Sequence, residues 1–382
     1  MKRCLYLLCA LCLLLTGCSI SPPKGEQMTD IVHNEPILLE TSVALIDRDR
    51  LLTKEQGQLM IDLLSKWYRF IGSFEEENFA PLFAAGSKEA DQHAASCRTL
   101  VAIREKAVED LRLRRCDITL TVTEVETDDG EVQVELNEDT VMQFAGLDVV
   151  SELFALPHIF KLCCGDEGWV ITHHEADDNP FFSFTYEEGC PTDPNLPLFL
   201  QNIQNRQQQQ REEAVPLSCD HPYDRDAAIA YMMSYCAYRN TAWHAYDDVG
   251  GNCMNFASQV LLAGGIPMDY RGDAKWYWES INKTDLPFIN VGNFLTYAQT
   301  NEGFGLVADA DANYYNGEAG DLLIFGVDSP RHMTEICGLV QDSEGNTIDY
   351  LLCSNTTNYR NFPAGAYYYT GQRLIKIYGW ND

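Results

Sequence analysis

The stretch Gly250-Gly251-Asn252-Cys253-Met254-Asn255-Phe256-Ala257-Ser258-Gln259 decides how the second half of this chain folds. Two glycines come before the cysteine, and apolar residues follow at helical spacing until Gly264-Gly265 and Pro267 supply a stop. This pattern predicts a short buried helix that begins near Cys253 and is entered through a flexible loop. A thiol at the positive end of a helix favours thiolate, the species that attacks a carbonyl carbon. The sequence therefore indicates a cysteine hydrolase.

A cysteine nucleophile needs a nearby base, and His332 is the only histidine that follows Cys253. It precedes an apolar run that predicts a strand, and a second run follows the turn residues 342–345. If those four residues form the loop, Gln341 pairs with Asn346 and His332 faces Asn355. Opposed side chains have Cβ atoms about 5 Å apart, so the Asn355 amide would accept the imidazole N–H. The predicted catalytic group is thus Cys253, His332 and Asn355.

Other interpretations of these residues stay open. Most cysteines are buried packing residues, and an asparagine beside Thr356 is also typical of a turn. His244 competes with His332 for the role of base, although it precedes Cys253 by nine residues. The backbone N–H of Cys253 is a candidate oxyanion donor because of its place at the helix start.

Several blocks of the C-terminal region closely resemble the bacterial putative amidase domain family. They are Tyr223-Asp224-Arg225 with Ala227-Ala228, residues 250–259, Ala263-Gly264-Gly265-Ile266-Pro267-Met268, Trp276-Tyr277 and Gly320-Asp321. The resemblance covers residues 223–378 and implies a papain-like fold, a cysteine nucleophile and amide hydrolysis in the cell envelope. The chain departs from the family at Asn355, where histidine is common, and at Asn252 and Met254, where aspartate and threonine are more frequent. An asparagine can still accept the imidazole hydrogen bond.

The N-terminus has the pattern of an export signal. Basic residues at positions 2 and 3 precede an apolar run to Leu15, and the run is too short for a stable membrane span. The ending Leu15-Thr16-Gly17-Cys18 resembles the lipobox of bacterial lipoproteins. We therefore expect a signal peptide over residues 1–17, lipidation of Cys18 and a tether over residues 18–36, which would hold the protein outside the cytoplasm on the bacterial membrane.

The remaining chain predicts an α+β protein of two domains. Residues 37–186 show helical patterns first and alternating strand patterns afterwards, with hairpin turns at Asp128-Asp129-Gly130 and at residues 165–168. A long helix is expected from near Lys88 to about Arg115. This order loosely resembles the nuclear-transport-factor-like cone fold. The polar residues 187–222 predict a linker, and residues 223–382 the papain-like domain, with the cysteine on a helix and the histidine and asparagine on an antiparallel sheet.

The composition limits the kinds of molecule that this protein is expected to bind. The net charge of −30 disfavours nucleic acid, because phosphate contacts need clustered lysine and arginine. Of the 14 cysteines, three lie in the expected signal peptide and Cys18 is the expected lipidation site; most of the remaining ten are expected to be small buried residues, since their spacing forms no disulfide framework. His173 and His174 should point to opposite faces of a strand, which disfavours a shared metal ion. We expect no cofactor and no metal.

The sequence thus predicts a lipid-anchored, extracytoplasmic cysteine amidase or peptidase, with peptidoglycan peptides as the substrate class. The principal alternative is a surface binding or adaptor protein with a catalytically inactive amidase fold. A metal-dependent hydrolase built on His173 and His174 is a third possibility. The sequence does not indicate an oligomeric state.

Overall fold

A computed structural model describes residues 37–166, 168–176, 184–271, 275–326 and 329–382. The predicted signal peptide, Cys18 and the tether lie outside these ranges. The helices are α1 (Lys54–Ser73), α2 (Glu89–Arg104), α3 (Leu196–Gln207), α4 (Arg225–Tyr235), α5 (Cys253–Ala263), α6 (Leu286–Ile289) and α7 (Val291–Thr300). With the strands below they give the predicted α+β class. In these described ranges, no helix is long and apolar enough to cross a membrane.

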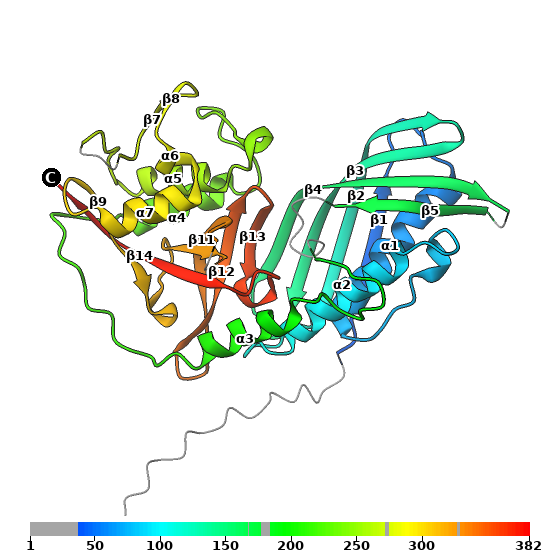
Figure 1. Cartoon of the computed structure of the whole chain (residues 1–382), viewed down its shortest axis with the longest axis horizontal. Helices are drawn as coiled ribbons and strands as arrows, with labels where there is room; N and C mark the ends of the chain where they lie inside the picture. The colour runs from blue at the N-terminus through cyan, green and yellow to red at the C-terminus, as the bar shows by residue number, and fades with distance from the viewer. Residues whose placement is uncertain (1–36, 167, 177–183, 272–274, 327–328) are drawn as a thin grey trace, which may run out of the picture. The chain divides into compact units, whose positions relative to one another are not determined.

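The N-terminal part holds two helices against a sheet (Figure 1). Its strands are β1 (Glu40–Ile46), β2 (Leu113–Asp128), β3 (Glu131–Phe144), β4 (Val150–Gly165) and β5 (Gly168–Glu175). Both predicted hairpins are confirmed, since β2 pairs antiparallel with β3 and β4 with β5. β1 pairs parallel with β2, which the sequence did not predict.

Helix α1 begins with the capping box that its sequence encodes. Gln56 N donates to Thr53 Oγ1 at 3.3 Å, and Thr53 N donates to Gln56 Oε1 at 2.8 Å, so two otherwise unpaired N–H groups are satisfied. The predicted end of the second helix was wrong, because α2 stops at Arg104. Asp110 Oδ1 accepts from Arg112 N at 3.0 Å in the following loop, and such a local side-chain bond competes with helix continuation.

The C-terminal part places helices α4 and α5 against strands β11 and β12 (Figure 1). Its strands are β6 (His221–Pro222), β7 (Trp278–Ser280), β8 (Lys283–Thr284), β9 (Gly305–Ala312), β10 (Leu322–Phe325), β11 (His332–Gln341), β12 (Thr347–Asn355), β13 (Asn358–Pro363) and β14 (Gln372–Asn381). β10 lies between β11 and β14 and pairs antiparallel with both. As predicted, the helix that begins at Cys253 packs on an antiparallel sheet.

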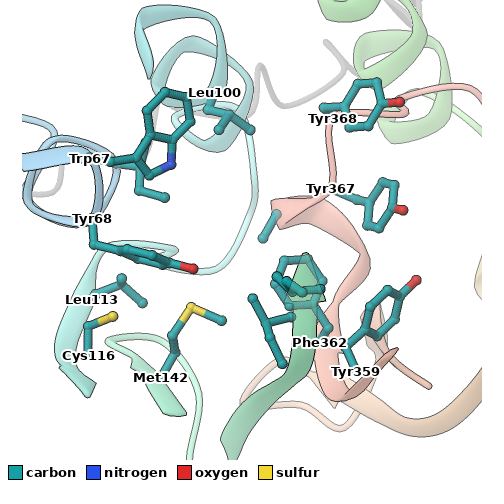
Figure 2. Packing of buried hydrophobic residues seen from close by; sticks show 14 of the residues in the cluster. Trp67, Tyr68, Leu100, Leu113, Cys116, Met142, Tyr359, Phe362, Tyr367 and Tyr368 are labelled. Carbon is teal, nitrogen blue, oxygen red and sulfur yellow. The ribbon is translucent and has the colours of Figure 1, made fainter. Parts of the chain in front are cut away.

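One sheet runs through both parts. β13 pairs antiparallel with β4, so the strand order continues from β1 through β4 to β13, β12, β11, β10 and β14. One buried cluster also contains side chains of both parts. Trp67, Tyr68 and Met142 belong to it, as do Phe362 and Tyr367 (Figure 2). The division into domains at residues 187–222 remains a prediction. Strands from both sides of this segment belong to one continuous sheet.

Candidate active site

Helix α5 begins at Cys253, after a loop that glycine makes possible. Gly251 has a φ of 101°, and a Cβ atom built there would lie 3.2 Å from the Thr356 side chain. A residue with a side chain would therefore be strained in its backbone and crowded at its Cβ. The glycine lets the loop approach the end of β12 closely, and this approach sets the position of Cys253.

The Cys253 thiol is buried and neutral. Its residue is only 6% exposed, and burial raises the pKa of the thiol above its usual value. Hydrogen bonds from the backbone at Met333 and Met254 and from the Thr356 side chain lower this pKa but do not outweigh burial. The thiolate expected from the helix terminus is therefore not the resting state. At this site the cost of burying a charged thiolate is larger than the stabilisation that the N-terminus of α5 provides.

Asn252 and Asn355 form a buried clamp next to the thiol. Asn252 Nδ2 donates to Asn355 Oδ1 at 2.7 Å, and Asn252 N donates to Thr356 Oγ1 at 2.7 Å. Asn355 Nδ2 in turn donates to the Tyr235 carbonyl at 2.7 Å, at the end of α4. The structure thus brings Asn355 and the Cys253 loop together. In this arrangement Asn355 positions the loop and the end of α4.

His332 lies on the other face of the sheet. Its ring stacks with Phe325 and Tyr367 at centroid distances of 6.2 and 6.0 Å, and its Nε2 lies 3.2 Å from Ser354 Oγ. Phe325 and Tyr367 belong to one buried cluster, whereas Cys253 packs with Met333 in the other. Because successive strand residues point to opposite faces, His332 and its neighbour Met333 cannot both face the thiol. Burial lowers the pKa of His332 to about 4, so the imidazole is neutral.

The predicted opposition of His332 and Asn355 is wrong by one residue of register. Gln341 pairs with Thr347 instead of Asn346, because the turn is one residue longer than predicted. The two register shifts that follow, between Val340 and Gln341 and between Ile336 and Gly338, offset each other, so Glu335 pairs with Cys353. A shift of one residue exchanges the two faces of a strand. For this reason Asn355 lies on the face of Cys253, and Ser354 takes the place beside His332.

Two residues near Cys253 lie outside the predicted catalytic group: His244, which the sequence offered as a competing base, and Glu335, which the sequence analysis did not single out. His244 is exposed, and its carbonyl accepts from Asn255 Nδ2 at 3.0 Å, next to the first turn of α5. Glu335 is fully buried on the thiol's side of β11, and its electrostatic influence is one of the causes that raise the pKa of Cys253. The sequence contained a signal for Glu335, because it is the single charged residue in the apolar run from Met333 to Val340.

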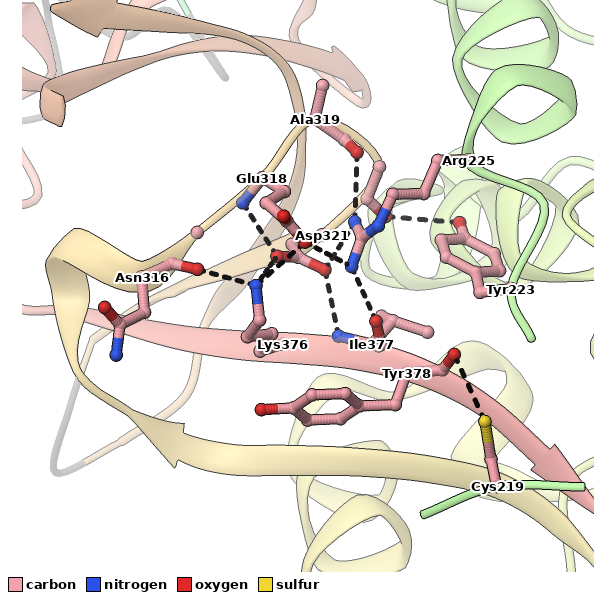
Figure 3. A network of polar contacts seen from close by, with 12 residues as sticks. Cys219, Tyr223, Arg225, Asn316, Glu318, Ala319, Asp321, Lys376, Ile377 and Tyr378 are labelled. Carbon is pink, nitrogen blue, oxygen red and sulfur yellow. Dashed lines mark hydrogen bonds and ion pairs between the residues drawn. The ribbon is translucent and has the colours of Figure 1, made fainter. Parts of the chain in front are cut away.

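Residues from the two ends of the C-terminal part, including the blocks at Tyr223 and Gly320, meet in one polar network (Figure 3). Arg225 Nη1 donates to the buried Asp321 at 2.8 Å, and Arg225 Nη2 donates to the Ile377 carbonyl at 2.6 Å. Ile377 N donates to Asp321 at 2.9 Å, and Tyr223 Oη donates to the Gly320 carbonyl at 3.1 Å. The network ties the start of α4 to β10 and β14, so these blocks have a structural explanation.

The histidines of the N-terminal part form a buried chain. His174 lies 3.0 Å from His158 and 3.3 Å from His93, and His158 lies 2.9 Å from Glu138. His173 lies on the opposite face of β5 from His174, as the strand alternation predicts, and its Nδ1 lies 2.9 Å from Glu89 Oε1. Within the described ranges, no group of three histidine, cysteine or acidic side chains could hold a metal ion.

The C-terminal part is similar to a known protein family. Residues 222–378 match the family described as the putative amidase domain, which confirms the resemblance in the sequence and supports amide hydrolysis in general and a hydrolase as the class of this domain. No curated protein and no solved structure matches the chain.

Proposed function

We propose that the C-terminal part hydrolyses amide bonds with Cys253 as the attacking group. The proposal includes export of the chain, anchoring through lipid on Cys18, and peptides of the cell envelope as substrates. The observation that carries it is the match of residues 222–378 to the amidase family, within which Cys253 is the first residue of α5. A helix start supplies backbone N–H groups for the charge that develops on the carbonyl oxygen.

The reaction would proceed through a thioester. The Cys253 sulfur attacks the carbonyl carbon, its proton passes to an imidazole, and the amine leaves with that proton; water then hydrolyses the thioester. The resting arrangement is not ready for this step, because the thiol is protonated and His332 faces the other side of the sheet. His332 is the first residue of β11, and the backbone of the next residue, Met333, is hydrogen-bonded to the thiol. Catalysis by His332 therefore requires its side chain to turn to the helix-bearing face when substrate binds.

Mass spectrometry of purified muropeptides after incubation with the protein tests this proposal. Wild-type protein should produce new amine and carboxylate termini, and Cys253→Ala should abolish them. His332→Ala and His244→Ala identify the imidazole that serves as base, while Cys164→Ala, at an exposed cysteine remote in sequence, is the matched control. Equal cleavage by wild type and Cys253→Ala would reject the mechanism.

A second candidate is a binding or adaptor protein that does not hydrolyse its ligand. It is favoured by the neutral, buried thiol and by a cavity of about 680 Å³ that Cys253 does not line. Arg206, Arg331 and Arg373 line this cavity, so it offers guanidinium groups to a carboxylate in a chain that is strongly acidic overall. Retention of muropeptides by the wild-type protein without any cleavage, and loss of retention in Arg331→Gln, would favour this candidate.

A further inference from the structure

The cavity of about 680 Å³ lies between helix α3 and the strands β9 and β14. From α3 it is lined by Phe199, Asn202 and Arg206, which share one face of the helix because they are three and four positions apart. A helix face that packs against a protein is normally apolar, yet Ile203 is the single buried residue of α3. The polar lining from α3 therefore favours a binding site for a ligand over ordinary helix packing.

Hydrogen bonds between side chains of the wall hold the cavity in shape. Arg206 Nη1 donates to Gln372 Oε1 at 2.5 Å, and the guanidinium carbon of Arg206 lies 4.9 Å from the ring centroid of Tyr314. Asn202 Nδ2 donates to Thr370 Oγ1 at 3.4 Å. These contacts join α3 to the residues that lead into β14. A wall whose side chains are already ordered loses less entropy when a ligand binds.

The cavity collects positive charge in a chain whose net charge is −30. The described residues that line it include three guanidinium groups, from Arg206, Arg331 and Arg373, and one carboxylate, from Asp311. Arg373 Nε lies 3.6 Å from Asp311 Oδ1, so these two charges offset each other. Arg331 is exposed and forms no ion pair with any residue in the described ranges. Arg331 is therefore the cation that stays available to an anionic ligand, and a guanidinium group can bind a carboxylate through two parallel hydrogen bonds.

The rest of the lining suits a polar ring. Side-chain amides come from Asn202, Asn205 and Gln209, and an amide can both donate and accept a hydrogen bond, as a sugar hydroxyl group does. The rings of Phe199 and Tyr369 add flat apolar surface, against which the C–H face of a sugar can pack. Aromatic surface, amides and a free guanidinium group together fit a sugar that carries an acidic group.

We propose that this cavity binds a sugar that carries a carboxylate, with Arg331 paired to the carboxylate and Asn202 bonded to the polar groups of the ring. The choice of sugar rests on the proposed function, in which the chain lies at the cell envelope. There the lactyl carboxylate of N-acetylmuramic acid is joined to the peptide by an amide bond. Hydrolysis of that bond releases the peptide as an amine and leaves the carboxylate on the sugar. The cavity thus recognises glycan from which the peptide has been removed.

Isothermal titration calorimetry of the full chain tests the ligand class. N-acetylglucosamine is the matched ligand, because it lacks the lactyl carboxylate of N-acetylmuramic acid. We expect N-acetylmuramic acid to bind at least about 10-fold more tightly, the effect of one hydrogen-bonded charge pair. Equal affinity for the two sugars, or no measurable binding at millimolar concentration, would overturn the proposal. Tighter binding of N-acetylglucosamine 6-phosphate would also overturn it, because the site would then select phosphate.

Substitutions in the wall test the two residue roles. Arg331→Gln should weaken binding of N-acetylmuramic acid about 10-fold and leave binding of N-acetylglucosamine unchanged, whereas Asn202→Ala should weaken both. Arg48→Gln, at an exposed arginine outside the cavity, is the matched control and should bind as wild type does. Wild-type affinity in Arg331→Gln would overturn the assignment of the carboxylate.

The same titration separates this inference from amide hydrolysis. Cys253 does not line the cavity, so Cys253→Ala should bind N-acetylmuramic acid as tightly as wild type. Sugar binding by a protein that cleaves no muropeptide would reject the hydrolysis and keep this site. Cleavage by wild type without sugar binding would reject this site and keep the hydrolysis. Loss of sugar binding in Cys253→Ala would contradict the placement of the sugar in this cavity.

Discussion

The placement of His332 predicts a specific loss of stability in mild acid. In the folded protein its imidazole is neutral and its pKa is lowered to about 4 by burial, whereas an unfolded chain protonates histidine near the ordinary value of about 6.5. Below pH 6.5 the unfolded state therefore binds more protons than the folded state. The stability that His332 contributes is complete above about pH 6.5, falls as the pH decreases, and stops falling below about pH 4.

The size of the effect follows from these two pKa values. Between them, each pH unit changes the free energy of unfolding by about 1.4 kcal/mol for one group. At pH 4.5 the two values give a loss of about 2.5 kcal/mol from His332 alone. Other buried histidines act in the same direction, because burial lowers the pKa of His93 to about 3. The whole protein should therefore lose more than this amount, and a variant is needed to isolate His332.

The contribution of His332 is isolated by urea unfolding of wild type and His332→Gln at pH 7 and pH 4.5. Glutamine can keep a hydrogen bond to Ser354 but does not titrate, so the fall in free energy between the two pH values should be about 2.5 kcal/mol smaller in the variant. His244→Gln, at an exposed histidine, is the control and should match wild type. An equal fall in His332→Gln and wild type would refute the reasoning. A larger fall in the variant would point to an imidazolium paired with the Cys253 thiolate.

Three further changes test the packing around the site. Asn355→Ala should lower the free energy of unfolding by about 2 kcal/mol, because the Tyr235 carbonyl and the Asn252 amide lose their hydrogen-bond partner. The control Asn346→Ala, at an exposed asparagine, should change this free energy little. Equal effects of the two substitutions in urea unfolding would contradict the role of the Asn252–Asn355 pair. Glu335→Met should raise it by about 1–3 kcal/mol by removing an unpaired buried acid, and a destabilised variant would show that Glu335 has a partner in solution. Thr53→Ala should cost about 1 kcal/mol through loss of the α1 cap, and an unchanged melting temperature would contradict that capping role.

Sequence patterns predicted those parts of the fold that depend on local chemistry. The helix that begins at Cys253 and both N-terminal hairpins are present, because each depends on neighbouring residues. The pairing of β13 with β4 could not be predicted, since it joins residues about 200 positions apart.

The candidate site was predicted less completely. Asn355 does meet the loop that precedes Cys253, but His332 does not join them, because a turn one residue longer than predicted changes which residues of β11 and β12 share a face. The polar residues of a turn do not mark its boundary to a single residue. The neutral state of the Cys253 thiol was also missed, because desolvation depends on tertiary packing and not on the helix terminus alone.

Intact-mass analysis of protein quenched in acid during incubation with a peptide substrate tests the central proposal most directly. A thioester on Cys253 adds the mass of the acyl part of the substrate, and peptide mapping locates it. We predict this adduct in wild type and its absence in Cys253→Ala, together with loss of product. Product formed by Cys253→Ala, or released by wild type while an acyl group accumulates on another residue, would contradict the proposal.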